Sequence, residues 1–393
     1  MQKRTPAMQQ FDRFKRAHPD CVLLFRMGDF YESFEQDALT LHKALGLTLA
    51  NRTSDTPMVG VPHHQLETYL RRLIDQGFRV AVADQVQDPK DAKGVVERAV
   101  TRVVTPGTLV DESLLPDHAS ATLGAVLIDD DRAHIAAADL STGRFLLLDC
   151  HAESLIDELS RLGVTEILFA ESAPGTTPRA IETASVALSI PTTPRASWQF
   201  RPDESREALL ELYRVTTLGG FGLDDEDACL RPAGAIVRYL RETQISDNES
   251  ALVPRATLAH LSPPTREDPS GLCMIDAVSM RALEVERTIR EGALEGSLLG
   301  VFLASGSACA TPMGKRLLRD WLCRPLADAG SIQARHAAVA TLVEDRRTGK
   351  ELHQALDGIQ DVARIAGRLA LDRATPRDIV ALARSLGRIG TLT

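Results

Sequence analysis

The residues best suited to chemistry follow a break in an apolar run near the start of the chain, in the segment MGDFYESF. Gly28 and Asp29 interrupt the run, so we expect the residues after them to lie on or near a surface. In an extended segment Phe30 and Glu32 point to one face, and Tyr31 points to the other. An aromatic ring can wedge into a stack of bases, while a neighbouring carboxyl group hydrogen-bonds a base edge. The alternative is that Phe30 is a core residue and Glu32 a solvated charge.

Basic side chains in the same region could contact phosphates. They are Arg52, Lys90, Lys93, Arg98 and Arg102. Phosphate contacts position a duplex without reading its sequence, and they supply much of the affinity. The alternative for each of these residues is an ordinary solvated charge, which is the common state of surface Lys and Arg.

A second candidate site consists of carboxylates in the middle of the chain. Asp139 lies late in an expected strand, downstream of the acidic turn 129–131 and upstream of Glu153, Asp157 and Glu158. Such a set could hold two Mg²⁺ ions, as in a metal-dependent nuclease. However, Asp is also favoured in hairpin turns, and acidic residues are favoured in the first turn of a helix. Both interpretations remain open from the sequence.

Other signatures of chemistry are missing from the sequence. The pair His63 and His64 has no HExxH pattern, and neighbouring residues do not share a helix face. Six scattered cysteines form no CxxC pair, which argues against a zinc ribbon or a disulfide framework. The Gly-Lys pairs at 314–315 and 349–350 lack the following Ser or Thr of a P-loop, and no GxSxG or GxGxxG occurs. We therefore expect no metal site, no cofactor and no enzymatic activity in this chain.

Alternating strands and helices precede residue 115 and predict an α/β unit, which the segment LLPDHAS closes. A second α/β unit opens with an antiparallel meander, and a Pro/Thr/Ser-rich stretch at 174–202 is expected to be irregular or exposed. The expected strands are 21–27, 78–86, 96–107, 123–129, 133–141, 143–149 and 165–171, and the expected helices are 35–45, 65–76, 153–162, 203–213 and 231–241.

From residue 272 onward the pattern is helical only, after a boundary at 261–271 that is rich in proline. A long amphipathic helix is expected over 272–290. Thr311-Pro312 and Thr375-Pro376 each place an N-cap threonine before a proline at the first helical position. The sequence therefore predicts a multidomain protein in which an all-α bundle or stalk follows two α/β units.

Charge is distributed unevenly along the 393 residues. The net charge of −9 consists of 0 over residues 1–116, −12 over 117–270 and +3 over 271–393. The acidity of the whole chain therefore does not argue against nucleic-acid binding by its first and last parts. No stretch is long and apolar enough to cross a membrane, and no secretory signal is visible, so we expect a cytoplasmic protein.

Long segments resemble the N-terminal half of bacterial MutS proteins, a family that acts in DNA mismatch repair. They are residues 5–38, which include MGDFYESF, residues 56–115, ADLSTGRF at 138–145, and the stretch 274–326. The resemblance implies a mixed-sheet α/β mismatch-binding domain over 1–115, a ribonuclease-H-like connector domain over 120–250, and part of a helical core and lever domain over 265–393.

The resemblance also implies roles for single residues. It makes Phe30 the ring that stacks on a mispaired base and Glu32 the acid that hydrogen-bonds that base. Arg52 and Arg102 fall where the family has basic residues that contact the DNA backbone, and Met27 is expected beside the wedge and the backbone.

The resemblance further implies partners and a location. They are duplex DNA with mispairs or small loops, a second copy of the chain in the full-length family, and a MutL-type protein on the connector, in a nucleoid-associated location. Family members carry an ATPase domain beyond the levers, so we expect ATP and Mg²⁺ only there. The alternatives are the nuclease described above and a scaffold that does not bind DNA.

Overall fold

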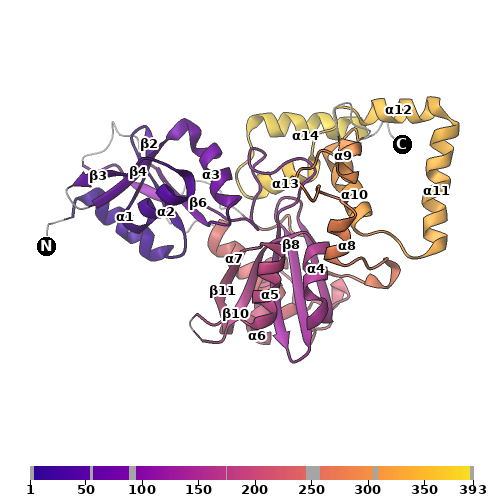
Figure 1. Cartoon of the computed structure of the whole chain (residues 1–393), viewed down its shortest axis with the longest axis horizontal. Coiled ribbons are helices and arrows are strands. Elements are labelled where there is room, and N and C mark those ends of the chain that lie inside the picture. Colours follow the sequence, from indigo (N-terminus) through magenta and orange to yellow (C-terminus); the bar gives the residue numbers. More distant parts are fainter. Residues whose placement is uncertain are drawn as a thin grey trace.

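The computed structural model describes residues 4–53, 56–87, 94–173, 175–244, 257–303 and 309–389. Within these ranges, no helix is long and apolar enough to span a membrane. Figure 1 shows two α/β units followed by a helical unit, and the first and third units lie near the same end of the second.

The first unit contains a six-stranded mixed sheet with helices on both faces. Its elements are α1 (Pro6–Ala17), β1 (Val22–Met27), β2 (Phe30–Phe34), α2 (Glu35–Leu45), β3 (Ala50–Thr53), β4 (Thr56–Pro62), η1 (His63–Gln65), α3 (Leu66–Ile74), β5 (Val80–Gln85) and β6 (Arg98–Val104). The strand order is β3-β4-β2-β1-β5-β6, and of these pairs only β1 with β5 is parallel.

Alternation along the buried strands explains why both faces of this sheet are covered. In β1, Leu24 packs with α2 and α3, whereas Leu23 and Phe25 pack with Phe11 and Phe14 of α1. Successive residues of a strand point to opposite faces, so an uninterrupted apolar run such as CVLLF requires a cover on each side. The predicted strands and helices of this unit are confirmed, the helix 35–45 with the same bounds.

The second unit is built on another six-stranded sheet, in the order β11-β10-β7-β8-β9-β12. Its elements are β7 (Thr122–Asp129), β8 (Arg132–Asp139), β9 (Arg144–His151), η2 (Ala152–Ser154), α4 (Leu155–Arg161), β10 (Val164–Glu171), α5 (Arg179–Leu188), β11 (Thr192–Ala196), η3 (Ser197–Phe200), α6 (Pro202–Tyr213), η4 (Gly219–Phe221), α7 (Leu230–Gln244) and β12 (Thr265–Arg266). The predicted antiparallel meander is confirmed by the pairing of β7 with β8 and of β8 with β9.

The expectation of irregular chain over 174–202 is wrong, although many of its described side chains are exposed, among them Val186 at 76% and Trp198 at 44%. This stretch contains α5, which buries Ile181 and Ala184, and the edge strand β11, which pairs in parallel with β10. Pro194 lies within β11, and proline is tolerated there because an edge strand has one side without ladder hydrogen bonds. The proline-rich boundary at 261–271 also contains β12, which extends the sheet beside β9.

The third unit is helical, as predicted. Its elements are η5 (Pro269–Gly271), α8 (Ala277–Ala282), α9 (Leu298–Leu303), α10 (Pro312–Cys323), α11 (Ala329–Glu344), α12 (Arg346–Leu356), α13 (Val362–Ala370) and α14 (Pro376–Ile389). The predicted caps are present: the Thr311 hydroxyl accepts from the Gly314 N–H at 3.0 Å, and the Thr375 hydroxyl accepts from the Asp378 N–H at 3.3 Å. None of the described residues of α11 and α12 is buried.

The long helix expected over 272–290 is not formed. The Asp276 carboxylate caps α8 by accepting from the Ser279 N–H at 2.8 Å, so the helix starts late. At Glu284 the backbone takes a φ of 49°, a left-handed conformation that ends a helix. The helical spacing of apolar residues continues beyond Glu284, which is why the sequence predicted a longer helix. Such spacing does not show where the backbone turns to a left-handed conformation.

Candidate nucleic-acid interface

The break at Gly28 and Asp29 is the tight turn of a hairpin between β1 and β2. Gly28 has a φ of 60°, which glycine adopts without strain, and Met27 pairs with Phe30 across the turn. The turn is tied to the next element because the His63 N–H donates to the Asp29 carbonyl at 2.9 Å. The hairpin is therefore a fixed part of the sheet.

Phe30 and Glu32 share one face of β2, as predicted. Phe30 is 47% exposed, Glu32 is half-buried and Tyr31 is buried on the opposite face. Glu32 pairs with Gly60 of β4, and a Cβ at Gly60 would lie 3.6 Å from Phe30 Cδ1 and 3.8 Å from Glu32 Cγ. Both side chains thus lie over the backbone of Gly60, and the interpretation of Phe30 as a core residue is wrong.

Gly60 is the part of this site that the sequence reasoning missed. A glycine inside a strand often marks a close approach of other groups to the backbone, and this one interrupts the run PMVGVP. That signal was present in the sequence, but nothing there paired Gly60 with Glu32. The register of β2 and β4 makes the connection.

Tyr31 anchors the strand from its buried face. Its hydroxyl donates to Asp84, whose other carboxylate oxygen accepts from the Thr101 hydroxyl at 2.7 Å, and the Arg26 guanidinium lies 5.3 Å from its ring centroid. Burial and the hydrogen bond to Asp84 disfavour the phenolate and raise the pKa of Tyr31 to about 12. The phenol is therefore a neutral donor at ordinary pH, and it holds β2 against β5 and β6.

Arg98 lies beneath the hairpin and not on a phosphate-accessible surface. It is buried, and its Nε donates to the Arg26 carbonyl at 2.6 Å, while its Nη2 lies 3.4 Å from the Met27 sulfur. Its guanidinium also lies 4.9 Å from the Phe25 ring centroid. The hypothesis of a phosphate contact from Arg98 is wrong, and so is the alternative of an ordinary solvated charge, because the side chain is buried. Met27 does lie across the turn from Phe30, and its contact with DNA stays a prediction.

Arg102 is held by two carboxylates, Glu67 of α3 and Asp111 of the segment that follows β6. Its guanidinium donates to Asp111 at 2.9 Å and to Glu67 at 2.5 Å, and its side chain is mostly buried. Burial alone would lower the pKa of Arg102, but the bond to Glu67 and the charge of Asp111 raise it. These contacts support a structural role for Arg102. Its contact with the DNA backbone stays a prediction.

The structure describes little of the remaining basic candidates. The backbone of Arg52 lies in β3, but its side chain is outside the description. Lys90 and Lys93 lie outside the described residues altogether.

Among the described residues, the carboxylates proposed for a nuclease form no group of three with their ligand atoms close together. Asp139 and the turn 129–131 lie at opposite ends of the β7–β8 hairpin. The Asp139 carboxylate accepts from the Ser141 N–H at 2.9 Å and hydroxyl at 2.7 Å, and Glu158 forms a buried ion pair with Arg161. These carboxylates cap a turn and neutralise a cation, so the interpretation as a two-metal site is wrong.

One group in the described part of the chain has metal-ligand chemistry that the sequence reasoning missed. The ligand atoms of His134, Asp149 and Cys229 lie within 4.8 Å of one another. Asp149 already accepts from Cys229 at 3.0 Å and pairs with Arg266, and burial raises the pKa of the Cys229 thiol. A protonated thiol and an adjacent guanidinium disfavour a cation, so we interpret the group as a hydrogen-bonded cluster.

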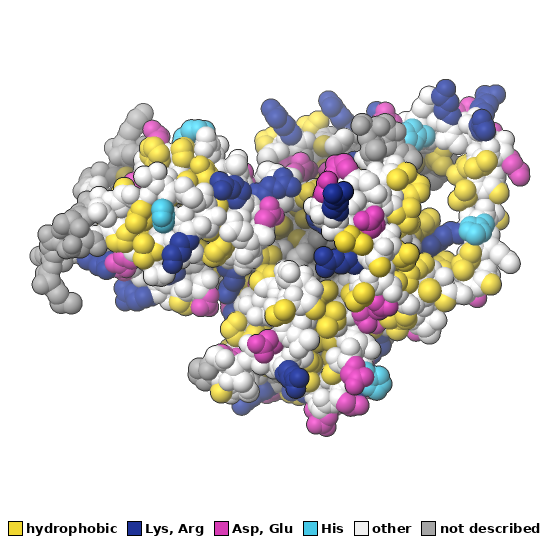
Figure 2. All heavy atoms as spheres, viewed as in Figure 1, with side chains coloured by type: hydrophobic (Ala, Val, Ile, Leu, Met, Phe, Trp, Pro, Cys, Tyr) yellow, Lys and Arg dark blue, Asp and Glu magenta, His cyan; other side chains and the backbone are white. Residues whose placement is uncertain are grey.

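Acidic side chains gather at the end of the second unit that lies farthest from the other two, as Figure 2 shows. This agrees with the net charge of −12 over residues 117–270. A polyanion would be repelled from that end and less so from the first unit, whose charge is balanced.

The matches to known proteins follow the three units. The family models MutS domain I, MutS domain II and MutS domain III match residues 5–113, 121–252 and 278–393. The fold and these matches define a multidomain protein built from MutS domains I, II and III.

Curated relatives extend this similarity to nearly the whole chain. Proteins named DNA mismatch repair protein MutS from Acaryochloris marina, Methanothrix thermoacetophila and Rhodopirellula baltica are 38%, 36% and 38% identical over 99% of this chain. The chain covers 42–44% of these relatives, so it spans less than half of their length. It belongs to the MutS family and corresponds to its N-terminal portion.

Proposed function

We propose that this chain recognises mispaired or unpaired bases in duplex DNA, as the sensing part of a MutS-type mismatch repair protein. The observation that supports this most is the exposed ring of Phe30, which shares a face with Glu32 at the end of a rigid hairpin. A large apolar ring is costly to leave in water, and it has a use when it stacks on a base.

The mechanism rests on the cost of deforming DNA. Mispairs differ in the edges that they present, so no single set of base-edge contacts can detect all of them. A mispaired step unstacks and kinks more cheaply than a matched one, and inserting Phe30 there costs a few kcal/mol less. Discrimination then follows from the difference in deformation energy.

Glu32 has a distinct role in this proposal. It lies beside Phe30 over Gly60, where its carboxyl reaches the edge of the base on which the ring stacks. Arg52, Arg102 and Met27 complete the proposed interface as contacts to the backbone, with Arg102 supported least because two carboxylates hold it.

The proposed domains are 1–115 for mismatch recognition, 120–250 for the connector and 265–393 for the helical core and lever. A ribonuclease-H-like fold for the connector is supported by its antiparallel strands β7-β8-β9, followed by β10 and β11 in parallel on the other side of β7. We propose duplex DNA as the partner of this chain. For the longer family members we propose homodimerisation, a MutL-type partner on the connector, and ATP with Mg²⁺ in a further domain.

The test compares the binding of Phe30→Ala to a duplex with one mispair and to the matched duplex, by fluorescence anisotropy at fixed salt. Stacking on an aromatic side chain is worth about 1–3 kcal/mol, so we expect the preference for the mispair to fall about tenfold or more. Trp198→Ala is the matched control, because Trp198 is 44% exposed but lies on the connector.

An equal loss of affinity for both duplexes in Phe30→Ala would refute the role as a wedge. Absence of any DNA binding by the wild-type chain would favour the scaffold alternative instead.

A further inference from the structure

The segment 105–119, which joins β6 of the first unit to β7 of the second, is buried over 105–108, at Val110 and at 114–115, although it has no regular structure. All its residues are described, and none lies in a helix or strand. Thr105, Thr108, Val110, Leu114 and Leu115 are each at most 5% exposed. Connecting segments normally lie on the surface, because buried backbone polar groups need partners. Arg102 and Glu67 of the first unit bond to its residues Asp111 and Ser113, and further partners come from the second unit and the helical unit.

The first half of the segment is held by Glu166 of β10, which is fully buried. Its Oε2 accepts from the Thr105 hydroxyl and from the Gly107 N–H at 3.0 Å, and its Oε1 accepts from the hydroxyls of Tyr239 and Thr193 at 2.7 and 2.8 Å. An ionised carboxylate can only accept hydrogen bonds, and these four donors supply two to each oxygen of Glu166. A Cβ at Gly107 would lie 2.9 Å from the Glu166 Cβ, so the backbone approaches as closely as glycine permits.

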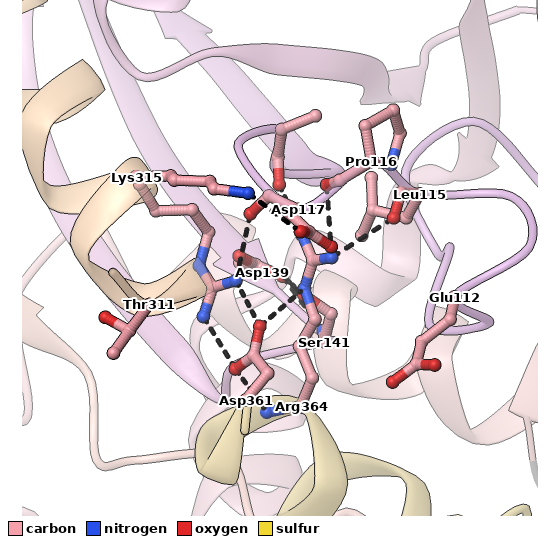
Figure 3. Close-up of polar contacts among 12 residues, drawn as sticks. Glu112, Leu115, Pro116, Asp117, Asp139, Ser141, Thr311, Lys315, Asp361 and Arg364 are labelled. Atoms are coloured by element: carbon pink, nitrogen blue, oxygen red, sulfur yellow. Dashed lines mark hydrogen bonds and ion pairs between the residues drawn. The ribbon is translucent and has the colours of Figure 1, made fainter. Parts of the chain in front are cut away.

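The second half is held by Arg364 of α13, in the helical unit, as Figure 3 shows. Arg364 is 2% exposed, and it donates to the carbonyls of Leu115 at 3.2 Å, Pro116 at 3.1 Å and Ala119. Arginine has five donors in a planar fork, so it can hold several carbonyls of an irregular backbone at once.

The charge of Arg364 is only partly matched by a carboxylate. Asp361 lies 3.6 Å from its Nε, but that carboxylate is shared with Arg316 of α10. Burial and the neighbouring Arg316 both lower the pKa of Arg364. The dipoles of the three carbonyls therefore stabilise the charge, which binds the segment and the helix to each other.

Further contacts from the helical unit surround this one. Lys315 forms an ion pair with the Asp117 carboxylate at 3.1 Å (Figure 3). Arg316 donates to the Asp117 carbonyl at 3.2 Å. Arg368 pairs with Glu112 at 2.8 Å. Basic side chains from α10 and α13 thus contact the segment from residue 112 to residue 119.

We propose that segment 105–119 is a strut that sets the orientation of the first unit relative to the helical unit, and that Arg364 is its positioning residue. The strut continues directly into β6, and β6, β5, β1 and β2 form consecutive hydrogen-bonded pairs up to Phe30. A displacement of α13 is therefore transmitted to the hairpin, and a kink at the hairpin to α13. The functional part of this inference rests on the proposed recognition of mispairs.

The test compares Arg364→Met, which keeps the length of the side chain and removes its donors, with Arg347→Met. Arg347 is 87% exposed on α12 and pairs only with Glu351 among the contacts described for it. We expect Arg364→Met to raise amide hydrogen exchange at Leu114, Leu115 and Ala119 at least tenfold, and to lower the preference for a mispaired duplex about fivefold. Arg364→Lys should restore part of both, because its ammonium still reaches a carbonyl, and Arg347→Met should change neither.

A second variant protects the test against misfolding. If Arg364→Met fails to fold, Glu166→Gln replaces it. The glutamine amide keeps the shape of the carboxylate, but its NH₂ group cannot accept the hydrogen bonds that one of the Glu166 oxygens accepts. For Glu166→Gln we expect faster exchange at Gly107 and the same loss of preference.

Wild-type exchange rates in the folded variants would overturn the strut. Faster exchange with an unchanged preference would overturn the positioning role. A wild-type chain without any preference for the mispair would refute the proposed function, and the exchange measurement would still decide whether the strut exists.

Discussion

The hairpin that carries Phe30 is regular backbone that exposes an apolar ring, whereas the strut 105–119 is irregular backbone of which about half is buried. In the hairpin, β2 satisfies its own polar groups through ladders with β1 and β4. In the strut, Glu166 and Arg364 provide the partners from other units.

This difference indicates where function and stability reside. A side chain on a self-satisfied strand can change without unfolding the strand, so the exposed face of β2 is free to serve recognition. A buried irregular segment depends on each external partner, because an unpaired buried polar group costs about 1–3 kcal/mol. Substitutions at the hairpin should therefore change binding, and substitutions at the strut should change stability and orientation.

The largest effect on stability is expected for Gly107→Ala in the strut. The new Cβ would lie 2.8 Å from Leu123 Cδ1 and 2.9 Å from Glu166 Cβ, and both neighbours are buried. Overpacking of this kind costs about 1–3 kcal/mol, and we expect the upper part of that range. Thermal unfolding followed by circular dichroism measures it.

Gly60→Ala in β4 is the matched control, because its Cβ meets Phe30 and Glu32 only at ordinary contact distances. We expect it to be neutral or to stabilise by up to about 1 kcal/mol, since alanine restricts the unfolded chain. Equal destabilisation by the two substitutions would contradict the comparison of the two regions.

An intermediate effect is expected for Tyr239→Phe, which removes one donor to Glu166. Hydrogen bonds to charged groups contribute about 1.5–3 kcal/mol, so we expect a loss near 2 kcal/mol. Tyr213→Phe removes a bond to the neutral carbonyl of Ser262 and should cost about 1 kcal/mol. Denaturant unfolding monitored by fluorescence compares them, and a smaller loss for Tyr239→Phe would argue against the Glu166 anchor.

The smallest effect is expected for Tyr31→Phe at the hairpin, about 0.5–1 kcal/mol at pH 8, because water can replace part of the bond to half-buried Asp84. The folded-state pKa of Tyr31 is raised from 10.0 to about 12. The wild-type advantage is therefore complete below pH 10 and declines as the pH rises toward 12.

The free energies of unfolding of the wild type and of Tyr31→Phe, each measured at pH 8 and pH 11, test this change. The contributions of the other titrating groups are shared by the two proteins and cancel in the difference. A wild-type advantage that grows with pH would contradict the assigned shift.

Local patterns predicted much of the fold. The helix 35–45 and the meander β7-β8-β9 follow from period and turn residues, and the N-caps Thr311 and Thr375 follow from the Thr-Pro pairs. The expectations of irregular chain over 174–202 and of a long helix over 272–290 were wrong for opposite reasons. In the first, proline masked an edge strand, and in the second, a regular period concealed the left-handed turn at Glu284.

By itself the sequence determined that a ring and a carboxylate share one face after a turn, since the alternation of a strand is local. It also determined the family, whose motifs are contiguous. The tertiary structure alone decided that Gly60 lies under Phe30, that Arg98 and Arg102 are engaged within the protein, and that Arg364 binds a segment about 245–249 residues away in the chain. These contacts depend on strand register and domain packing, which bring together residues that no local pattern relates.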